Sequence, residues 1–313
     1  IIPGLVGSEM CIRDSLLSLA QLSRKEIEDL ISFAEKFIND DGTFKKESLF
    51  PDKTIANIFC EPSTRTKSSF EIAAKNLGCN VLDFDTETSS LQKGESIYDT
   101  VDALSLMGVD MCILRHSESV IHELTQYIPE MSFINGGEGS ISHPTQGLLD
   151  LMTITQHKET IDDQNIVIVG DLDHSRVTAS FIEGISNFDF KSLTFSGHPE
   201  MCKSFHNHPK GKYEPDLNIA IEGADVIVAL RIQHERLEAQ DIVDIDQYKY
   251  EYQINSERLA MAHEDAILMH PGPVNLDIEI STMVYESDQC VIRQQIANGV
   301  AMRMAVLSQY LSG

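Results

Sequence analysis

The stretch from Glu61 to Phe70, EPSTRTKSSF, determines the fold that we expect for this chain. Before it, the apolar run TIANIFC at residues 54–60 is typical of a short β-strand. The residues from Thr66 onward predict an amphipathic helix that ends at Gly78. A turn from a strand into a helix directs free backbone N–H groups, and the positive end of the helix dipole, at one point. Such a point can bind phosphate.

The side chains of this turn support the phosphate hypothesis. Ser63, Thr64 and Thr66 offer hydroxyl donors, and Arg65 offers a planar guanidinium that matches phosphate oxygens. The alternative is an ordinary N-capped helix with an arginine on the surface. Because short motifs also occur by chance, these residues alone leave both interpretations open.

The charge of the chain excludes two classes of partner. Its 313 residues include 24 Lys and Arg against 49 Asp and Glu, which gives a formal net charge of −25 at pH 7. Such a chain has no cationic field to attract nucleic acid or anionic lipid, so we expect no nucleic acid and no membrane as partner. No apolar run approaches the roughly 20 residues that cross a bilayer. An anionic ligand would require the few arginines to gather in one pocket.

The cysteine and histidine patterns indicate neither a metal site nor disulfides. Six cysteines are scattered without a C-x-x-C pair, which is typical of buried thiols in a reducing cytoplasm. His198, Cys202, His206 and His208 lie close together but lack the spacing of a zinc site. The chain also lacks a G-x-G-x-x-G fingerprint after a strand and a P-loop, so no cofactor is expected.

Strands and helices alternate along most of the chain. Apolar runs at residues 80–84, 111–115 and 132–136 alternate with helix-like segments, and the alternation starts again at residues 165–170. This order predicts an α/β protein of two domains, each a mostly parallel sheet flanked by helices. Residues 1–14 include EMCIRDS, which resembles a translated transposon-adapter sequence, so we expect this segment to be non-native.

Polar residues gather where the expected strands end. They are the residues of STRT, Arg115, His143, Arg176, Arg231 with Gln233, and Pro271 with Gly272. Ligands of open α/β sheets bind beyond the carboxyl ends of the strands. Arginines scattered over a surface would not favour this edge, so the pattern predicts a binding site for anions there.

Seven motifs occur along the chain in a characteristic order. They are STRT (63–66), QKGES (92–96), LRH (114–116), HPTQ (143–146), GDL-x-x-S-R (170–176), LRIQHER (230–236) and HPGPVN (270–275). Their order and spacing resemble the catalytic chain of the aspartate carbamoyltransferases, in the aspartate/ornithine carbamoyltransferase family, over residues 15–312. QKGES and RIQHER favour the aspartate branch, and the S-M-G and H-C-L-P motifs of the ornithine branch are missing.

The resemblance implies a reaction and a division into domains. The carbamoyl group of carbamoyl phosphate would pass to the amino group of L-aspartate, giving N-carbamoyl-L-aspartate and phosphate, in de novo pyrimidine biosynthesis. A carbamoyl phosphate-binding domain would comprise residues 15–150 and a C-terminal helix at 289–313, and an aspartate-binding domain residues 151–288. Two helices, the one after His143 and the C-terminal one, would link the domains. Carbamoyl phosphate would bind first because its site lies deeper.

The resemblance also assigns roles to individual residues. Carbamoyl phosphate would be bound by Ser63, Thr64, Arg65, Thr66, Arg115, His143 and Gln146, of which Arg65, Thr66, Arg115 and His143 would be catalytic. Aspartate would be bound by Arg176, Arg231, Gln233 and the main chain at Pro271 and Gly272.

Four further positions concern domain closure and assembly. Ser89 and Lys93 would enter the active site of a neighbouring subunit and complete its phosphate and aspartate sites, which implies a homotrimer with shared sites. Glu61 would pair with arginines and hold the two domains closed. Leu276 stands where a basic residue would be expected, which would change the contacts of that loop. Regulatory chains or a dihydroorotase-like chain are further partners that the resemblance leaves open.

Three alternative functions remain at this point. One is a carbamoyltransferase that uses another amine as acceptor. A second is a non-catalytic anion-binding or scaffold subunit, which the set Arg65, Thr66, Arg115, His143 and Arg231 argues against. A nucleotide-dependent dehydrogenase is the third, and the missing glycine fingerprint disfavours it.

Overall fold

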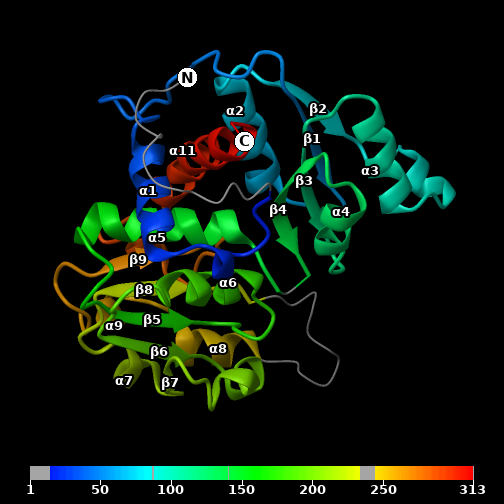
Figure 1. Cartoon of the computed structure of the whole chain (residues 1–313). Coiled ribbons are helices and arrows are strands. Elements are labelled where there is room, and N and C mark those ends of the chain that lie inside the picture. Colours follow the sequence, from blue (N-terminus) through cyan, green and yellow to red (C-terminus); the bar gives the residue numbers. More distant parts are fainter. Residues whose placement is uncertain (1–14, 87, 140, 233–243, 313) are drawn as a thin grey trace.

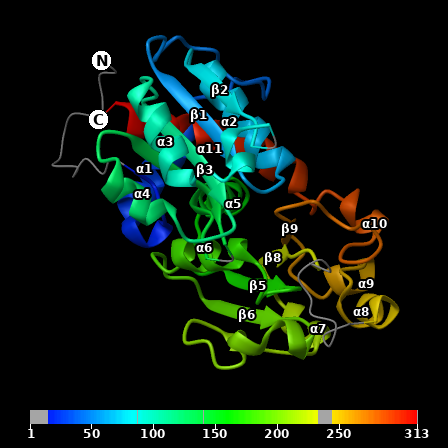
Figure 2. The ribbon, with the colours of Figure 1, turned by 90° about the vertical axis from the view of Figure 1, so that its right-hand side faces the viewer.

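The computed structural model describes residues 15–86, 88–139, 141–232 and 244–312. It contains two parallel β-sheets, each flanked by helices, and the two sheets lie one above the other in Figure 1. Figure 2 shows the same ribbon after a rotation of 90° about the vertical axis. The α/β architecture predicted from the alternation of strands and helices is therefore confirmed. Residues 1–14, expected to be non-native, lie outside the described residues.

The sheet of the first domain has the strand order β2-β1-β3-β4 within the described residues. Its strands are β1 (Thr54–Phe59), β2 (Asn80–Phe84), β3 (Met111–His116) and β4 (Ser132–Glu138), and its helices are α1 (Arg24–Glu35), α2 (Thr64–Asn76), α3 (Ile97–Leu106) and α4 (Ile121–Tyr127). Successive side chains of a strand point to opposite faces. Ile55 accordingly joins the core that contains Phe70 of α2, and Ala56 joins the core that contains Val101 of α3.

The sheet of the second domain has the order β7-β6-β5-β8-β9 in the same described ranges. Its strands are β5 (Asn165–Val169), β6 (Ser192–Ser196), β7 (Lys212–Tyr213), β8 (Val226–Ala229) and β9 (Ile267–Met269). Its helices are α6 (Arg176–Ile185), α7 (Leu217–Ile221), α8 (Ile245–Tyr252), α9 (Ser256–Leu259) and α10 (Thr282–Tyr285). β5 and β8 are almost entirely buried, as expected for central strands of a sheet covered on both faces.

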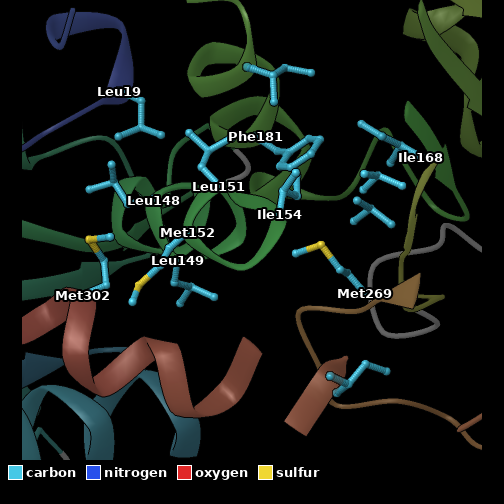
Figure 3. Packing of buried hydrophobic residues seen from close by; sticks show 14 of the residues in the cluster. Leu19, Leu148, Leu149, Leu151, Met152, Ile154, Ile168, Phe181, Met269 and Met302 are labelled. Atoms are coloured by element: carbon cyan, nitrogen blue, oxygen red, sulfur yellow. The ribbon is translucent and has the colours of Figure 1, made fainter. Parts of the chain in front are cut away.

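Helix α5 (Pro144–Lys158) leads from β4 of the first sheet to β5 of the second, and it is buried from Pro144 through Ile154. It packs against α6 and against α11 (Ile292–Leu311), and its apolar side chains fill the space on both sides (Figure 3). The contact with α6 is close, because a Cβ atom at Gly147 would lie 2.9 Å from the carbonyl oxygen of Ser180. The two domains therefore share apolar packing around α5.

Helix α11 returns from the second sheet to the first domain. It packs against α1, α2 and α5, and at its start against β9. Of its residues, those from Asn298 to Ser308 are all buried. A helix that is buried on all sides lies inside the core of a protein, so α11 connects the two halves of the molecule through its interior. Within the described ranges, no helix combines the length and the apolarity that crossing a bilayer would require.

The structure corrects the sequence prediction in two places. α2 begins at Thr64, two residues before the predicted start, so all of STRT after Ser63 belongs to its first turn. Between β6 and β9 the apolar runs of the sequence predict only the strand in DVIVAL (225–230), whereas the structure also contains β7 and the short helices α7, α8 and α9. Most of these elements are too short for a hydrophobic period to show in the sequence.

Candidate active site

The STRT motif lies where the turn after β1 enters α2. Ser63 is the N-cap residue of α2, but its hydroxyl accepts no hydrogen bond from the helix. An ordinary N-capped helix would use that hydroxyl to satisfy a backbone N–H group. Arg65 is exposed, whereas Thr66 is buried and faces the interior of the molecule. The first backbone N–H groups of α2 are therefore not capped by the Ser63 hydroxyl and can face an anion, as the phosphate hypothesis requires.

Thr66 meets His143 at the entrance to α5. Thr66 Oγ1 lies 3.3 Å from His143 Nε2, and both side chains are buried. The backbone N–H of His143 donates to Ser180 Oγ at 2.8 Å, which fixes the residue against α6. Burial, with the positive charges of Arg115, Arg303 and Arg176, holds the pKa of His143 well below its ordinary value. The imidazole is therefore neutral and can act as a hydrogen-bond donor or acceptor, but not as a cation, near pH 7.

Two arginines converge on Glu61 after β1. Glu61 Oε2 lies 2.8 Å from Arg176 Nη1 and 3.5 Å from Arg115 Nε. Both guanidinium groups lie over Gly137, where a Cβ atom would be 2.8 Å from Arg115 Nη1 and 3.2 Å from Arg176 Nη1. A side chain at Gly137 would therefore displace these guanidinium groups, and the φ of +124° also favours glycine there. Because Glu61 and Arg115 belong to the first domain and Arg176 begins α6, the cluster bridges the two domains.

The loop after β9 completes the site from the second domain. A Cβ atom at Gly272 would lie 3.1 Å from Arg65 Nε, so this loop packs directly against STRT. The buried His270 accepts a hydrogen bond from Gly272 N through Nδ1 at 2.8 Å. Burial, with Arg65 and Arg231, lowers the pKa of His270 to about 3, so this ring is also neutral. Gly272 has a φ of +68°, which favours glycine at this turn.

Glu279 is a buried residue that the sequence interpretation missed. Its carboxylate accepts hydrogen bonds from Ile232 N at 3.1 Å and from Asn275 N at 2.6 Å. It thereby joins the chain next to Arg231 to the loop that follows Pro271. Burial raises the pKa of Glu279, while hydrogen bonds and Arg231 act in the opposite direction. No pattern in the sequence indicates this role, because one glutamate in a loop belongs to no hydrophobic period.

Several expected site residues are not brought to this cluster within the chain. Ser89 donates to Thr86 O at 3.0 Å, and Lys93 is exposed at the end of a single 3-10 turn (Ser90–Lys93) near α3, at the outer edge of the first domain (Figure 1). In the described part of the chain, neither hydrogen-bonds to STRT. Gln233 lies outside the described residues. Leu276 is 45% exposed on the loop after Gly272.

The histidines of the second domain have structural roles. His198 caps a short 3-10 helix, His206 lies against the ring of Tyr213, and His208 stacks on Phe205. The buried Cys202 thiol donates to Gly170 O. Among the described residues, no group of three or more His, Cys, Asp or Glu side chains is arranged to hold a metal ion.

Comparisons with known proteins agree with this geometry. The family model described as the carbamoyl-P binding domain of aspartate/ornithine carbamoyltransferases matches residues 14–156, and that of the Asp/Orn binding domain matches residues 162–310. The chain belongs to the aspartate/ornithine carbamoyltransferase family. The resemblance drawn from the seven motifs is thus confirmed.

Individual members of the family are similar along almost their whole length. The aspartate carbamoyltransferase catalytic subunit of Coxiella burnetii (strain RSA 493 / Nine Mile phase I) is 41% identical over 300 residues, which cover 95% of this chain and 96% of the relative. The same subunit of Dehalococcoides mccartyi is 39% identical, with 93% and 89% covered. These carbamoyltransferase relatives favour the aspartate branch, as QKGES and RIQHER do.

Solved carbamoyltransferase structures share the fold. Aspartate transcarbamoylase from Trypanosoma cruzi, in complex with carbamoyl phosphate and aspartate, matches with a TM-score of 0.83 at 28% identity and covers 94% of this chain and 95% of that one. Ornithine carbamoyltransferase from Pyrococcus furiosus matches with a TM-score of 0.78, also at 28% identity, and covers 96% and 97%. The backbone alone therefore does not separate the two branches.

Proposed function

We propose that this chain catalyses the transfer of the carbamoyl group from carbamoyl phosphate to the amino group of L-aspartate, giving N-carbamoyl-L-aspartate and phosphate. The observation that carries the proposal is the convergence of Thr66, His143 and two arginines between the domains of an aspartate/ornithine carbamoyltransferase. Both substrates are anions, which explains an arginine-rich site in a chain of net charge −25. The product would serve de novo pyrimidine biosynthesis.

In the proposed mechanism, the first domain binds carbamoyl phosphate. Ser63, Thr64 and the backbone of α2 bind the phosphate group together with Arg65 and Arg115. Thr66 and the neutral His143 donate to the carbonyl oxygen, which gains negative charge as the tetrahedral intermediate forms. The aspartate amine attacks in its neutral form, and the departing phosphate accepts the proton. Rate acceleration then comes from positioning and from fixed donors rather than from a protein base.

The second domain would bind aspartate. Nη1 of Arg176 forms the ion pair with Glu61. Nη2 of Arg176 is buried and, among the described residues, makes no hydrogen bond. This Nη2 group would donate to a substrate carboxylate. Arg231 and Gln233 would bind the other carboxylate, and the carbonyl groups of Pro271 and Gly272 would accept from the amino groups. Because Arg65 touches the Gly272 loop, carbamoyl phosphate would bind first and order this second half of the site.

The assembly and the domain limits belong to the same proposal. Lys93 is exposed and the Ser89 hydroxyl bonds only to Thr86 of its own loop among the described residues, which supports a homotrimer in which this loop completes a neighbour's site. Whether regulatory or dihydroorotase-like chains join the trimer is a separate question of assembly. Residues 15–150 with 289–313 would form the carbamoyl phosphate domain and residues 151–288 the aspartate domain.

We propose a cytoplasmic location, on the pattern of the unpaired cysteines.

A carbamoylation assay on a size-fractionated sample tests the proposal. We expect aspartate, and not ornithine, to be carbamoylated, with the activity in a fraction of trimer size. Carbamoylation of ornithine or another amine instead would establish the rival acceptor. An Arg65→Ala variant with unaltered turnover would show that the measured activity does not come from this site, since that change removes a central phosphate ligand, and would revive the non-catalytic scaffold alternative.

The order of binding has its own test. Aspartate affinity is measured by calorimetry with and without a non-reactive carbamoyl phosphate analogue. We expect clearly tighter aspartate binding when the analogue is present. Equal affinities would contradict the ordered scheme but not the reaction itself.

A further inference from the structure

A carboxylate lies completely buried on α5, next to the proposed carbamoyl site. Asp150 has no exposed surface. Its Oδ1 accepts hydrogen bonds from Gln146 Nε2 at 2.9 Å and from Gln295 Nε2 at 2.8 Å. Its Oδ2 is buried and has no hydrogen-bond partner among the described residues. A buried carboxylate is costly unless it has a role that the rest of the structure requires, so its effect on the two amides needs an explanation.

The carboxylate determines which way the amide of Gln146 points. Oδ1 of Asp150 accepts from both amides, so any proton on this carboxyl group lies on Oδ2, and in either protonation state the group of Gln146 that faces Oδ1 must be its NH₂. The amide oxygen of Gln146 therefore points the opposite way. Within the described residues, Oε1 accepts no hydrogen bond. Gln146 lies on the first turn of α5, one turn from His143 and on the same face of the helix.

The second amide holds Asp150 itself in place. Gln295, on α11, is 1% exposed, and its Oε1 accepts from His270 N at 2.9 Å. Because its oxygen is taken by that backbone group, its NH₂ must face Asp150. Asp150 is therefore held in place by Gln295 of α11, which is itself held by the backbone of His270 after β9, as well as by Gln146 of its own helix. The orientation of Gln146 is accordingly fixed before any ligand arrives.

We propose that Asp150 is a positioning residue that turns the amide oxygen of Gln146 toward the carbamoyl NH₂ group of the substrate. The inference rests on the proposed function, and it adds the basis of selectivity between carbamoyl phosphate and other phosphates. Inorganic phosphate and acetyl phosphate offer the same anion but no NH₂ group to donate. A polar site built for one donor rejects ligands that lack it, because its acceptor is then left unpaired.

Two substitutions of similar shape distinguish the effect of the hydrogen-bond acceptor of Asp150 from the effect of its side-chain volume. Asp150→Asn keeps an oxygen that can accept from both amides. Its NH₂ group takes the place of Oδ2, which has no hydrogen-bond partner among the described residues. Asp150→Leu fills a similar space without an acceptor. Thr153→Val is the matched control, because Thr153 Oγ1 accepts from Asn298 Nδ2 at 2.9 Å and forms the next polar contact between α5 and α11. If Asp150→Leu does not fold, Asp150→Ala takes its place.

The affinities of carbamoyl phosphate and inorganic phosphate are measured by calorimetry for each variant, with melting temperature as a check of folding. We expect Asp150→Leu to weaken carbamoyl phosphate binding about tenfold, the effect of one well-made hydrogen bond, and phosphate binding less than about twofold. Asp150→Asn and Thr153→Val should keep the ratio of the two affinities. Acetyl phosphate should behave like inorganic phosphate.

Three results would overturn the inference. One is a wild type that binds carbamoyl phosphate and inorganic phosphate equally. The second is an equal loss for both ligands in Asp150→Leu. The third is the same change of ratio in Thr153→Val, because Asp150 would then only hold α5 to α11. Failure of the proposed function is distinguishable, because the wild type would then carbamoylate no aspartate, while the ratio of the two affinities would still decide the role of Asp150.

Discussion

Glu61 Oε2 and Arg176 Nη1 lie 2.8 Å apart, and this ion pair joins the turn after β1 to the first turn of α6. The two residues belong to different domains, so the pair joins the two halves of the site. The Arg176 side chain is only 5% exposed and that of Glu61 23%, so solvent screens the pair less than it would a surface pair. The family resemblance implies that Glu61 holds the two domains closed. Its contacts with Arg115 of β3 and Arg176 of α6 support that role, and they do not involve Leu276.

The first expectation concerns this pair. Glu61→Gln should cost about 1–3 kcal/mol of stability, less than a fully buried pair, because Arg176 loses its counter-charge. It should raise the KM for aspartate about tenfold, since Arg176 would no longer be held for the substrate carboxylate. Steady-state kinetics and thermal melting measure both effects.

A surface pair provides the control for Glu61→Gln. Glu71 and Lys75 lie one turn apart on α2 with an N–O distance of 2.5 Å and partly exposed side chains. Glu71→Gln should change stability by less than about 1 kcal/mol and leave KM unaltered. Equal effects of the two substitutions would show that Glu61 is an ordinary surface carboxylate.

The second expectation concerns the protonation state of His143. Its pKa lies well below the ordinary value, so the ring stays neutral as the pH falls from 8 to 6. Lowering the pH through this range should therefore produce no loss of turnover from protonation of His143. NMR of the His143 ring protons should show no titration with a midpoint between pH 6 and 8. A midpoint near 6.5 would mean that burial and the arginines do not act as described.

Removal of this ring should affect the chemical step. His143→Ala should lower kcat about 100-fold, the typical loss when one oxyanion donor is removed. His116→Ala is the control, because His116 lies at the end of β3 and its ring accepts from the backbone N–H of Glu118 at 3.0 Å. We expect it to change kcat less than about threefold. Comparable losses would assign the effect to general destabilisation.

The third expectation uses two glycines of similar backbone conformation. Gly137 has a φ of +124° and Gly108 a φ of +92°, so alanine strains the backbone at both. A Cβ atom at Gly137 would also meet Arg115 Nη1 at 2.8 Å, whereas Gly108 has nothing within 4 Å. Both alanine variants should lose about 1–2 kcal/mol of stability. Only Gly137→Ala should lower kcat/KM strongly, because it displaces a site arginine; equal activities would contradict this.

The elements that could be predicted from the sequence are those marked by a hydrophobic period, an apolar run or a helix-start pattern. Ser23 and Glu26 form a Ser-x-x-Glu pattern that predicts a helix start, and the structure has this capping box in both directions at the start of α1. The strands before the site residues also lie where the apolar runs placed them. Asp150 and Glu279 could not be predicted in the same way. Each is a single acidic residue whose role depends on partners far away in the sequence, such as Gln295 for Asp150. Long-range polar contacts leave no local pattern.

The last expectation concerns the effect of Asp150 on stability. Burial raises the pKa of Asp150 to about 7, against the hydrogen bonds from Gln295 and Gln146 and the charge of Arg303, which lower it. Because the folded state binds this proton more tightly than the unfolded state, the contribution to stability is complete below pH 4 and is lost as the pH rises through 7. Asp150→Asn carries no titratable proton there. The wild type should therefore lose about 4 kcal/mol relative to Asp150→Asn between pH 4 and 9. Urea unfolding of both proteins over this range measures the difference, and parallel curves would show that the carboxyl group keeps an ordinary pKa in the folded protein.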